Sequence, residues 1–414
     1  MDNQPELMNN QPKLMGWGRL TWLLMGTALC LPSLGIGYEI AKKYGMGAAL
    51  FGITLGNFLL FCLAYLGAIM SIEYRIPTSE QTERLVGPIG KRLFALVMMV
   101  VGLGWFAIQL QFVAKQLVLL AGWESGASMI AFALAMLMVV ANYWGIEGIT
   151  KWAEKTSPMV IAAMLLLLAR LCWGDKPTQE ASFDWSWNAM PLSLVLAGHI
   201  AYAIDQPTSL RFCKSRYDAV MTTWISFLLV ISVVQVMGAM AFWYYPCESI
   251  LVAFSSLSGT FWVSLLIFYL VFQIWAINHC NLFSAQVNLK VCFPILKEKT
   301  VWAISAFCAV LLSAAPLLEN LEHVLAFMGV LVAGMGGILY CEYALSSWRP
   351  RLNRSSIAFS SVVALFASYA AGWYAWSGVA VLDAFVVACT LYVLLRGCCE
   401  FMGGAHERSL DYVR

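Results

Sequence analysis

The amino-acid sequence predicts an all-α polytopic membrane protein with twelve transmembrane helices. Three observations carry this prediction. The first is composition, because 61% of the 414 residues are hydrophobic and 12% are charged, less than half of the ~25% charged fraction of soluble globular proteins. The second is a series of long apolar runs, and the third is the one-sided distribution of lysine and arginine. A net charge of +2 also excludes a nucleic-acid-binding protein and a polybasic peripheral protein.

A helix needs about 20 apolar residues to cross the hydrocarbon core of a bilayer. The connector at residues 72–91 is polar and is expected to hold a short amphipathic surface helix. Residues 1–15 are also polar and lack the apolar core and cleavage site of a signal peptide, so we expect a cytoplasmic tail. The predicted spans are residues 16–37, 47–71, 92–121, 127–146, 156–173, 189–209, 218–243, 260–288, 300–317, 320–345, 356–374 and 379–397.

The placement of lysine and arginine is an independent test of this count. With the N-terminus inside, all but five of the 25 Lys and Arg residues fall in cytoplasmic segments. Cytoplasmic loops carry an excess of basic residues, and one missed helix would invert every later loop. We therefore expect a multi-pass protein of the cell (inner) membrane, with both termini in the cytoplasm. The exceptions are Lys115 within a span and, on the outer side, Lys42, Lys43, Arg170 and Lys176.

Two of the spans are expected to be broken helices. The first contains Pro32 followed by Gly35 and Gly37, and the sixth contains Asp205 close to Pro207. Proline removes a helical hydrogen bond, and non-helical backbone at membrane depth is tolerated only where it faces protein or a water-filled cavity. Helices one and six occupy equivalent positions in two five-helix halves. The pair predicts an inverted-repeat secondary transporter with its binding site where the breaks meet, and two ordinary proline kinks are the alternative.

The repeat divides the chain into five segments. They are a cytoplasmic tail (1–15), a first five-helix unit (16–173), an inverted second unit (174–345), two further helices (346–397) and a cytoplasmic C-terminal tail (398–414). The 12 cysteines are scattered singly, without the paired spacing of a metal site or a disulfide framework. We expect neither a metal nor another cofactor.

Polar and aromatic side chains at membrane depth are the candidate site residues. On the third span, Trp105 and Gln109 are four residues apart and share a helix face, where a flat ring beside an amide suits a planar heterocycle. Helix packing with a satisfied indole is the alternative. On the sixth span, His199 precedes the break by less than two turns and is either a ligand or a hydrogen-bonded structural residue. Asp205 is either a gate or a structural counter-charge.

The eighth span carries a polar stripe, which should face the bundle interior because amides in hydrocarbon need partners. Asn281, Ser284 and Asn288 follow helical spacing, with Asn278 at the edge of the stripe. Asn281 is the better ligand candidate because it lies at mid-depth, and Asn278 is a second candidate. Bonding between helices explains Asn288. The sequence offers no explanation for Asp383 in the last span.

Several motifs stand in a recognisable order along most of the chain: Gly26 to Leu60, Gly104-Trp105-Phe106, Gly198-His199-Ile200-Ala201 to Phe212, Trp275 to Ser284, and Gly336-Gly337-Ile338 with Glu342-Tyr343. Together they resemble nucleobase–cation symporter family 1, the permeases for cytosine, purines, uracil, allantoin and hydantoins. The resemblance implies a LeuT-type five-plus-five inverted repeat with two added C-terminal helices. It also implies transport by alternating access.

The resemblance implies roles for individual site residues. Trp105 is similar to the tryptophan on which the flat base stacks, and Gln109 and Asn281 are similar to residues that hydrogen-bond its edge. Gly198 would offer its backbone to the base. The family usually has Trp or Phe where this chain has His199, which adds a hydrogen-bonding edge and a titratable group. The substrate can therefore differ from cytosine itself.

These observations predict a secondary active transporter that imports a small planar heterocycle, such as a pyrimidine or purine nucleobase, and that functions as a monomer. The main alternative is an amino-acid permease of the same architecture. Such a permease typically binds the substrate carboxylate at a glycine-rich helix-one break, whereas this break contains Pro32. A non-transporting scaffold or sensor is a third alternative. An intramembrane enzyme has no support, because the sequence lacks an HExxH motif, a Ser/His pair at helical spacing and clustered carboxylates.

The same resemblance bears on the coupling ion. Sodium-coupled members hold Na⁺ between backbone carbonyls at the first break and two hydroxyls on helix eight, and the matching positions here are Trp275 and Ala276. A hard cation needs several oxygen ligands, so the site is weakened. We therefore favour protons over sodium, with His199 or Asp205 as the carrier. The remaining candidates for a weak ion-binding site are Cys30, Ser33, Phe272 and Asp205.

The topology can be tested by labelling single cysteines or fusing reporters from each side of the membrane. Because basic residues concentrate on one side, we expect both termini and residues 72–91 to be cytoplasmic and residues 174–188 to be external. An external C-terminus would contradict the twelve-helix count and the assignment of the two repeats.

Overall fold

The computed structural model describes residues 14–123, 125–173, 188–314, 321–346 and 354–411. Within these residues the regular structure is helical, apart from one isolated bridge between Met15 and Cys213. A 3₁₀ turn, η1 (Asn142–Trp144), and a π-helix, η2 (Trp224–Val230), accompany the α-helices. The α-helices are α1 (Trp17–Ala28), α2 (Leu31–Tyr74), α3 (Thr78–Gln81), α4 (Glu83–Ala121), α5 (Ala127–Ala141), α6 (Gly145–Trp173), α7 (Ala189–Ile204), α8 (Gln206–Leu210), α9 (Arg216–Thr223), α10 (Ile231–Tyr244), α11 (Ile250–Ser255), α12 (Thr260–Cys292), α13 (Glu298–Ser313), α14 (Leu321–Ser346), α15 (Arg354–Tyr374) and α16 (Ala380–Asp411).

The predicted all-α fold class is confirmed, and the helices are consistent with the division into twelve spans. Among the described residues, eight helical runs are long and apolar enough to cross a membrane. Two of them are interrupted at predicted span boundaries, because Gly45 (φ 81°, ψ 163°) leaves helical geometry inside α2 and η1 separates α5 from α6. The other predicted spans coincide with the shorter helices α1, α7–α8 and α13.

The predicted surface helix in the connector 72–91 is wrong in one respect. The connector contains the single-turn helix α3, but its Thr78 and Ser79 side chains are fully buried. The Thr78 hydroxyl lies 3.4 Å from that of Thr208 in α8. This polar segment is therefore covered by the chain that follows the second break, a long-range contact that composition does not reveal.

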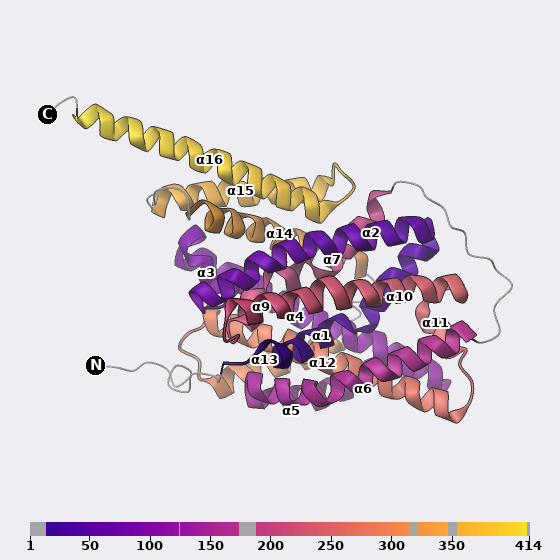
Figure 1. Ribbon diagram of the computed structural model, residues 1–414. Helices are drawn as coiled ribbons and strands as arrows, with labels where there is room; N and C mark the ends of the chain where they lie inside the picture. The colour runs from indigo at the N-terminus through magenta and orange to yellow at the C-terminus, as the bar shows by residue number, and fades with distance from the viewer. Residues whose placement is uncertain (1–13, 124, 174–187, 315–320, 347–353, 412–414) are drawn as a thin grey trace.

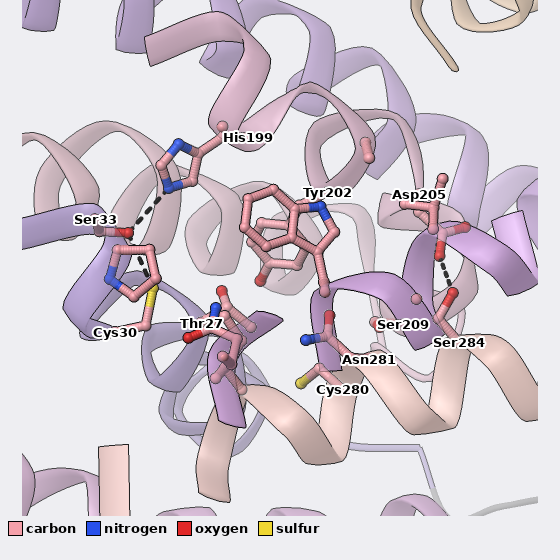
Figure 2. Close-up of a pocket in the computed structure, with 18 of the residues that line it drawn as sticks. Thr27, Cys30, Ser33, His199, Tyr202, Asp205, Ser209, Cys280, Asn281 and Ser284 are labelled. Atoms are coloured by element: carbon pink, nitrogen blue, oxygen red, sulfur yellow. Dashed lines mark hydrogen bonds between the residues drawn. The ribbon is translucent and has the colours of Figure 1, made fainter. Parts of the chain in front are cut away.

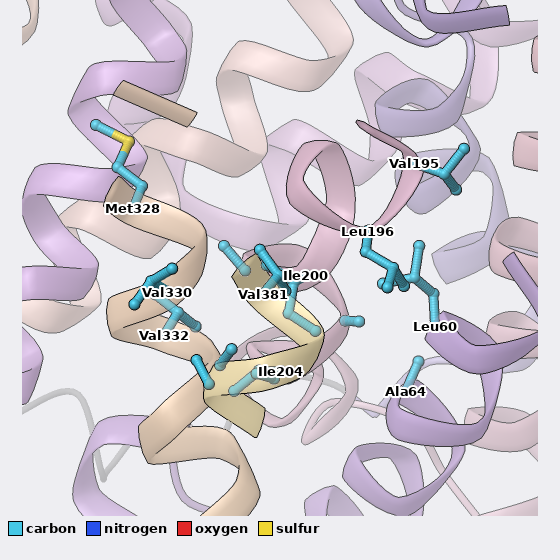
Figure 3. Packing of buried hydrophobic residues seen from close by; sticks show 14 of the residues in the cluster. Leu60, Ala64, Val195, Leu196, Ile200, Ile204, Met328, Val330, Val332 and Val381 are labelled. Atoms are coloured by element: carbon cyan, nitrogen blue, oxygen red, sulfur yellow. The ribbon is translucent and has the colours of Figure 1, made fainter. Parts of the chain in front are cut away.

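The long helices run side by side in one bundle, with α15 and α16 along one edge beside α14 (Figure 1). Leu60 of α2 and Val195 of α7 pack in a core that continues to Val332 of α14 and Val381 of α16 (Figure 3). A second core joins α4, α5, α6, α12 and α13. The start of α1 and the end of α16 lie at the same end of the bundle (Figure 1).

The first helix break lies between α1 and α2. Pro32 stands in the first turn of α2, where its missing N–H costs no helical hydrogen bond. The Leu31 N–H donates to Gln273 Oε1 at 2.9 Å, and the Leu29 carbonyl accepts from the Tyr269 hydroxyl at 3.3 Å. Buried backbone groups need such partners. The predicted break is confirmed, and two side chains of α12 satisfy its free backbone groups.

The second break lies at Asp205, between α7 and α8. The Tyr340 hydroxyl of α14 lies 3.3 Å and 3.4 Å from the carbonyl oxygens of Ala203 and Ile204, which no longer have helical partners. The Asp205 carboxylate accepts hydrogen bonds from Thr208 Oγ1 and from Ser284 Oγ of α12, both at 2.6 Å. This predicted break is confirmed as well, and α12 contacts both of them.

Replacing Gln273 by leucine should destabilise the protein, because it leaves the buried Leu31 N–H without an acceptor. The expected loss is about 1–3 kcal/mol of unfolding free energy. Unfolding of the detergent-purified protein measures it. Gln286→Leu is the matched control on the same helix, since its Nε2 has no hydrogen-bond partner among the residues that the structure describes. Equal stability of the two variants would show that the break does not depend on Gln273.

Candidate functional site

A cavity lies where the two helix breaks meet, between α1–α2, α4, α7–α8 and α12. About 800 Å³ in the cavity and its open mouth is free of protein atoms. The predicted site residues that line it are Trp105, Gln109, Gly198, His199 and Asn281, together with Cys30, Ser33 and Asp205.

Helix α4 contributes the aromatic face and one amide. Trp105 and Gln109 both line the cavity, as their four-residue spacing predicts. The Gln109 side chain is 1% exposed, and its Oε1 has no hydrogen-bond partner in the described part of the chain. A buried acceptor without a partner is costly, so this oxygen is available for a donor on a bound molecule.

His199 connects the two breaks at one end of the cavity (Figure 2). Its Nδ1 lies 3.4 Å from the Val195 carbonyl, which can only accept, so Nδ1 carries the proton in this arrangement. Nε2 is then the acceptor for Ser33 Oγ at 3.0 Å, and Ser33 in turn lies 3.2 Å from Cys30 Sγ. Both nitrogens of the ring are engaged, and the imidazole connects α7 to the start of α2.

Asn281 of α12 lines the cavity, whereas Asn278 does not. Asn281 Nδ2 donates to Asn278 Oδ1 at 3.2 Å, and Asn278 Nδ2 donates to the Phe106 carbonyl at 3.3 Å. Asn278 is fully buried and orients Asn281, so the structure gives it a supporting position instead of a place in the cavity. No hydrogen bond from the described residues reaches Asn281 Oδ1, so this atom can accept from a ligand.

Asp205 and Ser284 lie at the opposite end of the cavity from His199 (Figure 2). Tyr202 stands between His199 and this pair, and its ring stacks on Phe227 at a centroid distance of 4.7 Å. Tyr202 is three residues after His199 on α7, so the helical spacing could have identified it. Tyr202 is not among the site residues predicted from sequence.

Phe272 lies outside the cavity, where its ring stacks on Phe268 at 4.5 Å. Asp383 gains an explanation, because its carboxylate accepts from the Ser377 N–H at 2.9 Å in the first turn of α16. A negative charge at a helix N-terminus is favourable. Lys115 is exposed on α4 and does not contact the site.

No protein-family model and no curated protein sequence matches the chain, so the comparison depends on structure. A closed conformation of Mhp1, a nucleobase-cation-symport-1 family transporter with bromovinylhydantoin bound, superposes with a TM-score of 0.75 at 15% identity, covering 95% of this chain and 94% of that one. The inward-facing conformation of Mhp1 gives 0.72 at 14% identity, covering 97% and 96%. A Na⁺-coupled sialic acid symporter gives 0.67 at 14% identity, covering 92% and 88%.

The chain has the fold of these membrane transporters. The agreement extends over nearly the whole length of each protein. The fold implied by the resemblance to nucleobase–cation symporter family 1 is thereby confirmed.

Proposed function

We propose that the protein is a secondary active transporter of nucleobase–cation symporter family 1, which imports a small planar heterocycle by alternating access. The observation that carries the proposal is the cavity at the meeting point of the two breaks. Its walls include the Trp105 indole, the Asn281 amide and Gln109 Oε1, which has no hydrogen-bond partner among the described residues. One protein of the same fold binds bromovinylhydantoin, a flat heterocycle. We place the protein in the cell inner membrane, as a monomer with cytoplasmic termini.

The polar groups of the cavity favour a ligand with ring N–H donors. As the amides are oriented, Gln109 and Asn281 both present an oxygen, because the Asn281 Nδ2 is used by Asn278. Lactam N–H groups of pyrimidines, purines and hydantoins supply such donors. Trp105 supplies a stacking surface, and base–aromatic stacking contributes about 1–3 kcal/mol.

An amino-acid substrate fits the first break less well. Helix N-termini bind carboxylates through free backbone N–H groups. At the start of α2, the Leu31 N–H is bonded to Gln273, Pro32 has none, and the Ser33 N–H lies 3.1 Å from the Cys30 carbonyl. The donors that an amino-acid carboxylate would need are therefore already engaged, which supports the heterocycle over this alternative.

Binding of a heterocycle should depend on Trp105 and Asn281. Trp105→Ala should weaken binding about ten- to a hundredfold through lost stacking, and Asn281→Ala should cost a similar factor by leaving a ring donor unpaired. Binding of a radiolabelled nucleobase or hydantoin to purified protein measures both effects. Trp373→Ala is the control, since that ring is 73% exposed and does not line the cavity. Unchanged affinity in both folded variants would move the site elsewhere.

The contacts between α1 and α12 weaken the case for a sodium ion between these helices. A Cβ added to Gly26 would lie 2.6 Å from the Ala276 Cβ, so these helices are in direct contact. The Trp275 ring packs on the rings of Trp152 and Phe272, at centroid distances of 5.3 Å and 5.8 Å. Aromatic carbon therefore stands at a position where a sodium site would require a hydroxyl ligand. We therefore propose that transport is independent of sodium and coupled to protons.

Asp205 is the proton carrier that the geometry favours. Its carboxylate lines the cavity and belongs to the second break, next to the hydroxyls of Thr208 and Ser284. A carboxylate at membrane depth is a common element of proton pathways. His199 is the weaker candidate, because both nitrogens of its ring are engaged by Ser33 and Val195.

Uptake into proteoliposomes tests the coupling. With choline in place of sodium, uptake should be unchanged, and an inward proton gradient should drive accumulation. Asp205→Asn should abolish the response to the proton gradient but leave substrate exchange intact. The reason is that an amide does not take up and release a proton near neutral pH. Asp383→Asn is the matched control at the end of another helix. A strict sodium requirement would contradict the proposal, as would gradient-driven accumulation by Asp205→Asn.

A further inference from the structure

A second pocket lies between α6 and α12, apart from the cavity at the breaks. Its walls include Glu147, Lys151 and Lys155 from α6, and Trp275 and His279 from α12. None of these residues lines the first cavity. The proposed transport mechanism gives the pocket no role, so its chemistry calls for a separate explanation.

Two buried polar atoms at this pocket lack partners in the described structure, Trp275 Nε1 and His279 Nε2. Asn142 determines the state of the histidine. Its Nδ2 donates to the His279 carbonyl at 3.0 Å, so its Oδ1 is the acceptor that bonds to His279 Nδ1. The proton is therefore on Nδ1, and Nε2 presents a lone pair. The residues of the pocket wall thus carry one buried donor, the indole N–H of Trp275, and one buried acceptor, His279 Nε2.

Charge at the pocket is positive. Lys151 and Lys155 are one helical turn apart, both are exposed, and neither has a carboxylate within salt-bridge distance among the described residues. Glu147 lies one turn before Lys151 and offsets one of the two charges. Glu154, the neighbour of Lys155, is already paired with Arg19 at 3.0 Å. The pocket therefore carries one net positive charge, and neither ammonium group is paired with a carboxylate of the described residues.

The surroundings indicate that an anion at this pocket belongs to a lipid. Trp144 and Trp152 line the same pocket and are 65% and 37% exposed, and Trp side chains concentrate at membrane–water interfaces. The pocket adjoins the connection between α5 and α6, which sequence predicts to be cytoplasmic. The cytoplasmic leaflet is the one that carries anionic lipids, and basic pockets between transmembrane helices bind their headgroups.

We propose that the pocket between α6 and α12 binds an anionic phospholipid with a hydroxylated headgroup, such as phosphatidylglycerol. The phosphate pairs with Lys151 and Lys155. A headgroup hydroxyl accepts from Trp275 Nε1 and donates to His279 Nε2, which satisfies both buried atoms at once. The bound lipid joins α6 to α12, the helix that contacts both breaks.

Native mass spectrometry of the full-length protein in detergent tests this directly, with phosphatidylglycerol and phosphatidylcholine of equal chain length as probes. We expect phosphatidylglycerol to bind preferentially, and Lys151→Gln with Lys155→Gln to weaken its binding about thirtyfold. Lys297→Gln with Lys299→Gln is the matched control, because those lysines are exposed and lie outside the pocket. The control should retain the lipid.

A second variant separates the buried polar atoms from the charges. Trp275→Phe keeps an aromatic ring and both lysines but removes the indole N–H, and it should weaken binding about two- to tenfold. Equal binding of the two lipids, or an equal effect of the two lysine double variants, would overturn the proposal. Displacement of phosphatidylglycerol by millimolar inorganic phosphate would also overturn it, since the site would then be one for a free anion.

Discussion

The hydrogen bonds that α12 makes to the two helix breaks are the constraint on which the rest of the structure depends. Tyr269 and Gln273 satisfy the backbone of the first break, and Ser284 bonds to Asp205 in the second. Asn281 lies between these contacts and faces the cavity. One face of one helix therefore stabilises both interruptions and supplies a ligand-facing amide. Without these partners, non-helical backbone would be too costly at this depth.

The same bonds influence what the cavity can accept. By occupying the Leu31 N–H, Gln273 removes the donor that would make the start of α2 a carboxylate site. Apart from the Asp205 carboxylate, which Thr208 and Ser284 engage, the groups left available are neutral, an indole on α4 and the side-chain oxygens of Gln109 and Asn281. An anionic ligand would find little compensation for its lost hydration, whereas a flat, neutral heterocycle needs only stacking and a few hydrogen bonds.

Much of this arrangement could be predicted from residue type and spacing. Proline beside glycine or aspartate within an apolar run located both breaks, and helical spacing brought Trp105 together with Gln109. What sequence could not resolve were contacts across the bundle. Asn278 and Asn281 look equivalent in a polar stripe. Only in the structure does Asn278 bond to the Phe106 carbonyl, which leaves its Oδ1 to orient Asn281. The capping role of Gln273 likewise depends on a residue 242 positions away.

The most direct test of the account is the thermal stability of the purified protein against a panel of nucleobases, hydantoins, nucleosides and amino acids. A ligand that binds only the folded state stabilises it by about 2.7 kcal/mol at a hundred times its Kd. The account predicts that at least one flat heterocycle with ring N–H groups raises the unfolding temperature and that no amino acid does. Stabilisation by an amino acid, with no effect from any heterocycle, would contradict it.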